Sequence, residues 1–307
     1  MDYQAILEEI QEEIQPFLSQ GRVADYIPAL AKIKKEQFGL SLTLFDGTNY
    51  SVGASETLFS IQSISKVFTF TLALKFFGPS LYKRIGHEPS GNPFNSLVQL
   101  EYEHGKPRNP FINAGAINIT DALINYYGSE EIAYAEVLEF IRSIADDSSI
   151  ITDELVAQSE MDHGHRNLAL ANLMKSFNNL DNCPQRVVET YFRHCAVEMN
   201  TKMLSRAVLY LANHGEDPIT NKVYISAQQA KRINAVMLTC GHYDASGDFA
   251  FHVGLPGKSG VGGGIVVVVP KKMGIAVFAP GLNEQGNSLV GTMALELFAQ
   301  KTGLSIF

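Results

Sequence analysis

The segment Ser63-Ile64-Ser65-Lys66 could supply a nucleophile together with its base. A serine and a lysine three positions apart lie on one face of a helix, and a lysine shielded from water can take the proton of the serine hydroxyl. The apolar run after Ser63 predicts a buried helix, whose N-terminal dipole would favour negative charge on a reacting oxygen. This spacing is found in serine enzymes that form acyl intermediates.

Spacing alone leaves a simpler interpretation open, in which Ser63 only caps a helix. The same spacing occurs again at Ser80-Leu81-Tyr82-Lys83, directly after Gly78-Pro79. A helix cap at Ser80 and a solvated Lys83 explain that second occurrence. We therefore expect the nucleophile at Ser63 and not at Ser80.

A second segment supports this choice. Residues 258–264 read Lys-Ser-Gly-Val-Gly-Gly-Gly and precede the apolar run 265–269. This order resembles the Lys-Thr/Ser-Gly edge strand of penicillin-recognising serine enzymes, where small residues let a substrate reach backbone N–H groups that bind an oxyanion. A phosphate or dinucleotide loop would instead lie between a strand and a helix. Lys301-Thr302-Gly303 ends too close to residue 307 to be this motif.

Asp162, His163 and His165 form a cluster that could suggest metal ligands. No third imidazole accompanies the two histidines at a usual spacing, and polar loop residues between helices explain the cluster. Cys183, Cys195 and Cys240 show no ligand spacing and are odd in number, which predicts reduced thiols. We expect neither a metal nor an organic cofactor.

Composition excludes several classes of protein. The chain has 307 residues, 46% of them hydrophobic, which is enough for a large core. Its formal charge of -8 would repel a polyanion, so we expect no nucleic-acid partner. The first residues are acidic where a signal peptide would be basic, and the apolar run 67–74 is too short to span a membrane. We expect a cytoplasmic protein without membrane contact.

Helices and strands are predicted from the spacing of apolar residues and from turn signals. Near the N-terminus we expect a helix at 4–15, a short helix at 29–35, and a hairpin of strands 40–45 and 50–52. The middle should be mostly helical, with a buried helix from Ser63, an irregular stretch at 79–115, and helices at 118–127, 130–145, 151–161, 166–177, 184–195, 201–213 and 226–239. Strands at 249–253, 264–269 and 275–279 and a helix capped by Asn287-Ser288 and ending near Lys301 should complete the chain.

This order places strands near both ends of the sequence, so they should pair across the helical insertion. We predict an α+β fold with an antiparallel sheet flanked by the terminal helices, plus a mostly helical domain. The sheet domain would comprise residues 1–62 and 245–307, and the helical domain residues 63–244. The active site would lie between the two.

The sequence resembles the L-glutaminase family of bacteria and mitochondria, which are serine-dependent enzymes with a β-lactamase-like fold. The match runs from Val23 to the last helix. Seven segments carry it: Ala24-Asp25-Tyr26-Ile27-Pro28, residues 59–66, residues 109–117, Ser159-Glu160 with Arg166-Asn167, Tyr191, Tyr243-Asp244, and residues 258–264. Seven segments in order are far more specific than the serine–lysine spacing alone.

The resemblance implies that Ser63 is the nucleophile and Lys66 its base. It also implies that L-glutamine contacts Tyr26, Asn113, Glu160, Asn167, Tyr191, Tyr243 and Val261. We expect Glu160 with Tyr191 to bind the ammonium group, and Asn113 with Asn167 to bind the carboxylate. Without the resemblance, each of these residues would pass for an ordinary cap, core or surface residue.

The resemblance implies hydrolysis of L-glutamine to L-glutamate and ammonia through a γ-glutamyl ester on Ser63. Lys66, with a pKa lowered by burial, would be the base. Backbone N–H groups of Ser63 and Val261 would form the oxyanion hole, and Tyr243 would relay a proton to ammonia. A homodimer or homotetramer is implied by the family.

Two alternatives stay open. A β-lactamase or penicillin-binding enzyme would carry Ser-Asp-Asn or Tyr-x-Asn as its second motif, and the nearest match is Leu180-Asp181-Asn182 without the hydroxyl. A binding module for amino acids would keep the pocket without turnover.

Overall fold

A five-stranded antiparallel sheet joins the two ends of the chain. The computed structural model describes residues 1–307. The strand order is β2-β1-β7-β6-β5, with β1 at Gly39–Leu44, β2 at Asn49–Gly53, β5 at Gly257–Ser259, β6 at Gly264–Val269 and β7 at Met273–Phe278. Strand β1 pairs with β7 in a register that places Gly39 opposite Phe278. The predicted pairing across the helical insertion is therefore confirmed.

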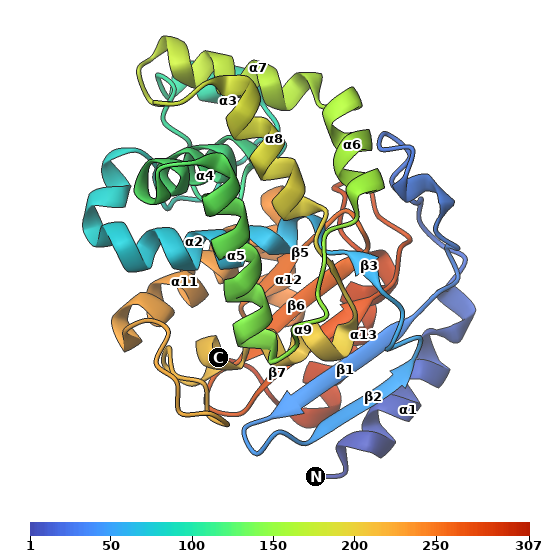
Figure 1. Cartoon of the computed structure of the whole chain (residues 1–307). Helices are drawn as coiled ribbons and strands as arrows, with labels where there is room; N and C mark the ends of the chain where they lie inside the picture. Colours follow the sequence, from blue (N-terminus) through green and yellow to red (C-terminus); the bar gives the residue numbers. More distant parts are fainter.

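Helices account for most of the remaining chain (Figure 1). They are α1 (Tyr3–Ile14), α2 (Ser65–Phe77), α3 (Leu97–Tyr102), α4 (Asn113–Tyr127), α5 (Glu130–Ala145), α6 (Glu154–His163), α7 (His165–Ser176), α8 (Pro184–Cys195), α9 (Thr201–Ala207), α10 (Leu209–Ala212), α11 (Ala227–Cys240), α12 (Ser246–His252) and α13 (Leu289–Thr302). Short 3₁₀ helices lie at Gln15–Phe17, Leu30–Lys32, Gln62–Ile64, Gly78–Lys83 and Tyr243–Ala245. Strands β3 (Phe59–Ser60) and β4 (Glu198–Met199) form a second, two-stranded sheet. None of the helices is long and apolar enough to cross a membrane.

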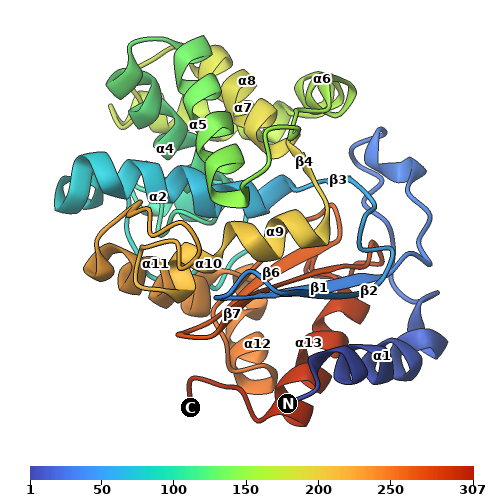
Figure 2. The same ribbon diagram turned by 60° about the horizontal axis from the view of Figure 1, so that its bottom comes forward.

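The large sheet separates two layers of helices, and Figure 2 shows it nearly edge-on. Helices α1, α12 and α13 cover one face, where Leu7, Phe249 and Phe298 pack against the strands in one apolar cluster. Helix α9 lies on the other face and is tied to β1 by a hydrogen bond between the hydroxyls of Ser41 and Thr201 (2.7 Å). The remaining helices extend from that second face.

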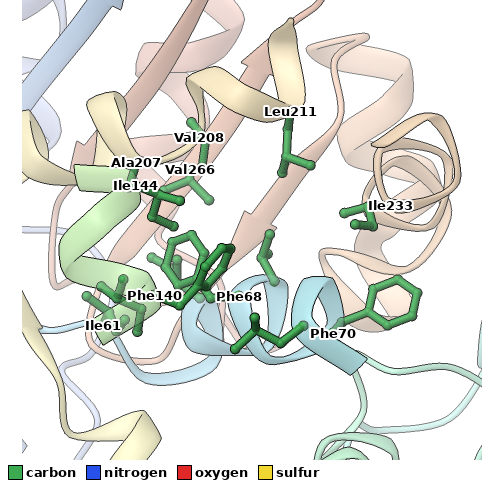
Figure 3. Packing of buried hydrophobic residues seen from close by; sticks show 14 of the residues in the cluster. Ile61, Phe68, Phe70, Phe140, Ile144, Ala207, Val208, Leu211, Ile233 and Val266 are labelled. Atoms are coloured by element: carbon green, nitrogen blue, oxygen red, sulfur yellow. The ribbon is translucent and has the colours of Figure 1, made fainter. Parts of the chain in front are cut away.

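Helix α2 runs through the centre of the helical layer. Every residue from Ser65 to Leu74 is buried, as the absence of a polar face predicts. Figure 3 shows its side chain Phe68 close to Phe140 of α5, with Val208 and β6 residue Val266 in the same cluster. Neighbours on all sides fix the position of α2 and of the turn that precedes it.

Most predicted elements are confirmed, with shifted ends. The hairpin β1–β2, strands β6 and β7 and the terminal helices lie where the sequence places them, and Ser288 caps α13 by accepting from the N–H of Gly291. Helix α4 begins at Asn113 instead of 118, because the side chain of Asn109 accepts from the N–H groups of Phe111 and Ile112 and so arranges the turn before the helix. The predicted helix 201–213 is two helices, α9 and α10.

Three predictions are wrong. The predicted strand 249–253 is helix α12, because Phe249 and Val253 are four residues apart and bury one helical face, a pattern that alternation in a short window also fits. The predicted helix 29–35 is only a 3₁₀ turn with Leu30 buried. Ser80 is not an N-cap, since its hydroxyl donates to the carbonyl of Phe77 (2.7 Å) inside a 3₁₀ helix.

A buried carboxylate holds together the loop that contains Leu180-Asp181-Asn182. Asp121 of α4 is fully buried and accepts hydrogen bonds from Arg84 and from the backbone N–H groups of Asp181 (2.9 Å) and Asn182 (2.8 Å). The Asn182 side chain also donates to Asp121 (2.9 Å). This segment therefore has a structural role in anchoring the 178–182 loop to α4.

We predict that Asp121→Ala lowers the free energy of unfolding by about 3 kcal/mol, because several buried donors lose their acceptor. Urea unfolding followed by circular dichroism measures the change. The matched control is Asp181→Ala, since the Asp181 carboxylate is more than half exposed and its ion pair with Arg84 should contribute less than about 1 kcal/mol. Equal losses of stability in the two variants would contradict the role of Asp121 as the anchor of this loop.

Candidate active site

One cavity of about 280 Å³ collects the polar residues that the sequence singled out. Its walls come from the loop after α1, the turn before α2, the loop before α3, the loop after β5, and parts of α4, α6, α7 and α8. The lining residues are Tyr26, Ile27, Gln62, Ser63, Phe94, Asn95, Asn113, Glu160, His163, Gly164, Arg166, Asn167, Tyr191 and Val261. Lys66 and Tyr243 do not line the cavity, because both side chains are buried beneath it.

Ser63 lies on a strained turn immediately before α2. Gln62 has a φ of 50°, a left-handed conformation that is uncommon for a residue with a side chain. Two hydrogen bonds hold it there: its side-chain amide donates to the hydroxyl of Ser60 (2.9 Å), and its carbonyl accepts from the hydroxyl of Ser65 (2.7 Å). Strain of this kind persists where the surroundings enforce it, which is common at reactive residues.

The glycine-rich loop after β5 packs directly on this turn. A Cβ atom at Gly260 would lie 2.6 Å from the carbonyl oxygen of Ile61 and 3.3 Å from the backbone nitrogen of Ser63. A Cβ atom at Gly262 would lie 2.3 Å from the carbonyl oxygen of Ser60. Only glycine permits this approach, which brings the backbone of Val261 beside that of Ser63. Neither of their backbone N–H groups donates to a carbonyl in the protein.

Lys66, the second residue of α2 and one helical turn after Ser63, is held in a position suited to a base. Only 1% of it is exposed, and its Nζ donates to the carbonyl of Phe111 (3.2 Å) and to Oδ1 of Asn113 (2.7 Å). Burial lowers the pKa of Lys66 to about 8, while Cys195 and Glu160 oppose the decrease. Roughly a tenth of the amine is therefore neutral at pH 7, far more than for a lysine in water.

Tyr243 lies between two buried lysines. Its ring centroid is 5.8 Å from Nζ of Lys66 and 4.3 Å from Nζ of Lys258, and its ring contacts that of Phe94 in a tilted arrangement with the centroids 4.6 Å apart. Burial raises the pKa of Tyr243, and the nearby Ser63 hydroxyl opposes the increase. The Tyr243 hydroxyl has no hydrogen-bond partner of ordinary geometry, so it is free to exchange a proton with a reacting group.

Glu160 is the only carboxylate in the cavity wall. Burial raises its pKa to about 7, against the lowering influence of a hydrogen bond from Gln62 and of the nearby Lys66. Across the cavity, Nδ2 of Asn113 donates to Oδ1 of Asn167 (2.9 Å), and the hydroxyl of Tyr191 lies 3.5 Å from Oδ1 of Asn113. An acidic group and a pair of amides thus lie in one pocket above Ser63.

The Asp162, His163 and His165 cluster has ordinary local contacts. Asp162 accepts from the Gln158 side chain (2.8 Å), and Nδ1 of His163 lies 2.8 Å from the carbonyl of Ser159. No group of three or more His, Cys, Asp or Glu side chains lies close enough together to hold a metal ion.

Sequence reasoning missed several lining residues. Gln62, Phe94, Asn95 and Arg166 line the cavity without having been given a role. The irregular composition of 79–115 was the available signal for Phe94 and Asn95, since a long irregular stretch in a compact domain is often functional.

A serine just before a buried helix, a lysine of lowered pKa and two free backbone N–H groups are the parts that a serine enzyme forming acyl intermediates requires. The model of the family described as Glutaminase matches residues 21–307. The chain belongs to this family, and its α+β, β-lactamase-like fold is the one expected from the sequence.

Individual relatives agree with this assignment. A glutaminase of Aliarcobacter butzleri (strain RM4018) is 58% identical over 307 residues, which is 100% of each chain. The solved structure of a probable glutaminase, YbaS, is 38% identical with a TM-score of 0.94 and covers 99% of this chain and 97% of its own. The Bacillus subtilis glutaminase YbgJ, solved as a covalent complex with 5-oxo-L-norleucine formed by reaction with 6-diazo-5-oxo-L-norleucine, is 35% identical with a TM-score of 0.89 over 100% of each chain.

We predict that Gly260→Ala lowers kcat by about 100-fold, because the added methyl group must push the loop away from the turn of Ser63 and misalign the two N–H groups. Steady-state kinetics measure the loss, and circular dichroism checks that the variant is folded. Gly247→Ala in α12 is the matched control, since nothing lies within 4 Å of the methyl group there. Full activity of the Gly260 variant would show that the close approach is dispensable.

Proposed function

We propose that this glutaminase hydrolyses the side-chain amide of L-glutamine through a γ-glutamyl ester on Ser63. The observation that carries the proposal is the position of Ser63 in the wall of the cavity, one helical turn from the buried Lys66. The covalent complex of the Bacillus subtilis relative supports covalent chemistry in the family.

The hydrogen bonds of Lys66 suit the first proton transfer. A neutral amine has two N–H groups, and Phe111 and Asn113 supply two acceptors. The lone pair is then left for the proton of the Ser63 hydroxyl, whose oxygen attacks the amide carbon of the substrate. The backbone N–H groups of Ser63 and Val261 donate to the resulting oxyanion.

Collapse of the tetrahedral intermediate breaks the carbon–nitrogen bond. The departing nitrogen takes up the proton that Lys66 received, with the Tyr243 hydroxyl as the relay, and leaves as ammonia. Water then gives a proton back to Lys66 as it attacks the ester carbon. As the second tetrahedral intermediate collapses, the ester C–O bond breaks, Lys66 gives this proton to the Ser63 oxygen, and L-glutamate is released.

The charges of the pocket suit a free amino acid. In the proposed pose the substrate ammonium lies against Glu160 and Tyr191, and its carboxylate accepts from Asn113 and Asn167. Tyr26 stands at the rim, with about half of its surface exposed, where it can cover the bound substrate.

Two alternative functions, a β-lactamase-like enzyme and a non-catalytic binding module, can be distinguished from this proposal. A β-lactamase or penicillin-binding enzyme needs its second motif in the site, and residues 180–182 are tied to Asp121 and do not line the cavity. A silent amino-acid-binding module would bind glutamine without releasing ammonia, so an ammonia-release assay separates it from an enzyme.

We further propose that the chain divides into a sheet domain of residues 1–62 and 245–307 and a helical domain of residues 63–244. The strands of the large sheet and helices α1, α12 and α13 fall in the first part, which supports this division. A cytoplasmic location, inferred from the sequence, and a homodimeric or homotetrameric assembly, implied by the family resemblance, complete the proposal.

We predict that Ser63→Ala abolishes glutamine hydrolysis while the protein stays folded, because the Ser63 side chain caps neither the 3₁₀ turn nor α2 and the substitution removes only one oxygen. Ser80→Ala, which carries the same substitution at an exposed serine, should keep full activity. Mass spectrometry of quenched wild-type reactions should show a γ-glutamyl adduct on the peptide that contains Ser63. An active Ser63 variant beside an inactive Ser80 variant would reverse the assignment.

We predict that kcat/KM increases with pH as Glu160 and Lys66 lose their protons, near their pKa values of about 7 and about 8. Below these values the ammonium of Lys66 cannot accept a proton and neutral Glu160 cannot pair with the substrate. Glu160→Gln should raise KM and move the acid limb to lower pH, since ionised Glu160 raises the pKa of Lys66. Lys66→Met should lose roughly 100- to 10,000-fold in rate.

Glu154→Gln is the matched control for this pH experiment. Glu154 begins the same helix, α6, but its side chain is 68% exposed and lies outside the cavity. An unchanged KM and pH profile in Glu160→Gln would remove Glu160 from the site.

A further inference from the structure

The wall of the cavity carries one permanent positive charge that the proposed mechanism does not use. Arg166, the second residue of α7, lines the cavity next to Asn167. Lys66 lies below the cavity, and among the lining residues only Arg166 is an arginine or a lysine. An arginine keeps its charge at every pH at which the enzyme could work.

Arg166 also has no carboxylate partner within the protein. Most other arginines form an ion pair, namely Arg84, Arg108, Arg142, Arg186, Arg193 and Arg206. The guanidinium of Arg166 forms none, although the chain has 32 acidic residues and a formal charge of -8. Its hydrogen-bond donors are therefore available to an anion that enters the cavity.

The hydrogen bonds of the neighbouring amides indicate where that anion lies. Nζ of Lys66 donates to Oδ1 of Asn113, and Nδ2 of Asn113 donates to Oδ1 of Asn167. The side-chain oxygens of both asparagines therefore already accept a hydrogen bond. This chain of hydrogen bonds from Lys66 ends at Nδ2 of Asn167, which donates to no group in the protein. A carboxylate bound to this donor would lie in the cavity that the Arg166 side chain also lines.

The two amides of Asn113 and Asn167 are neutral, so they cannot balance the net charge of the pocket once substrate is bound. A free amino acid brings one positive and one negative charge, and Glu160 adds a second negative charge once it is ionised. With neutral Lys66 the occupied pocket would carry an excess negative charge, and neutral amides cannot balance it. Arg166 brings the total to zero.

We propose that Arg166 is a specificity-determining residue, which selects substrates with a free α-carboxylate through its positive charge at the mouth of the cavity. The inference rests on the proposed function in taking glutamine as the substrate. Because Arg166 is exposed, the attraction is partly screened by water and salt, and it should act mainly on KM.

The test compares two substrates and matched variants. L-Glutamine α-amide carries a neutral amide in place of the α-carboxylate, so the charge of Arg166 should not affect its binding. For Arg166→Gln we expect kcat/KM for L-glutamine to fall roughly 5- to 10-fold through KM, with less than about a 2-fold change for the α-amide. Arg166→Lys should restore most of the preference for L-glutamine over the α-amide. Added NaCl should reduce the preference in the wild type and not in Arg166→Gln.

Lys231→Gln is the control for net charge, because Lys231 on α11 is exposed and lies outside the cavity. It should leave both substrates unchanged. Equal losses for both substrates in Arg166→Gln, or no loss for either, would overturn the proposal. If the wild type released no ammonia from glutamine, the proposed function would fail, and calorimetric Kd values for L-glutamine in the wild type and Arg166→Gln would still decide the role of Arg166.

Discussion

The removal of Lys66 from water is the constraint on which the site depends. An ammonium group buried with only two acceptors would leave one N–H group unsatisfied, so burial lowers the pKa of Lys66 and makes its neutral amine accessible. Such a position requires protein on every side of α2. The helical layer covers α2 on one side and the sheet with α9 closes the other, so strands from both ends of the sequence are needed to prepare one base.

A second constraint is the close contact between two backbones. The loop after β5 reaches the turn of Ser63 only because Gly260 and Gly262 lack side chains. The residues beside the reacting groups carry strain as well, since Gln62 and Tyr243 have φ values of 50° and 59°. A rigid sheet edge and a fully buried helix can hold these conformations, whereas a mobile loop would relax them.

The parts of the site that the sequence predicts are those defined by local spacing. The serine–lysine spacing, the glycine run and the hairpin at Asp46-Gly47 each depend on a few neighbouring residues. Phe94 and Arg166 could not be assigned this way, because their positions result from the packing of loops distant in sequence. The alternating apolar residues at 249–253 predict a strand wrongly for a related reason. Five residues can fit both a strand and one face of a helix, and packing against the sheet favours helix α12.

Substrate binding and base activation are linked through Glu160 in the proposed mechanism. In the free enzyme, ionised Glu160 raises the pKa of Lys66 and so favours the inactive ammonium form. A substrate ammonium placed against Glu160 offsets that negative charge and adds a positive charge near Lys66. Both effects favour the neutral amine. The substrate therefore prepares its own base, and a ligand without the ammonium group would bind to a site whose lysine is more often protonated.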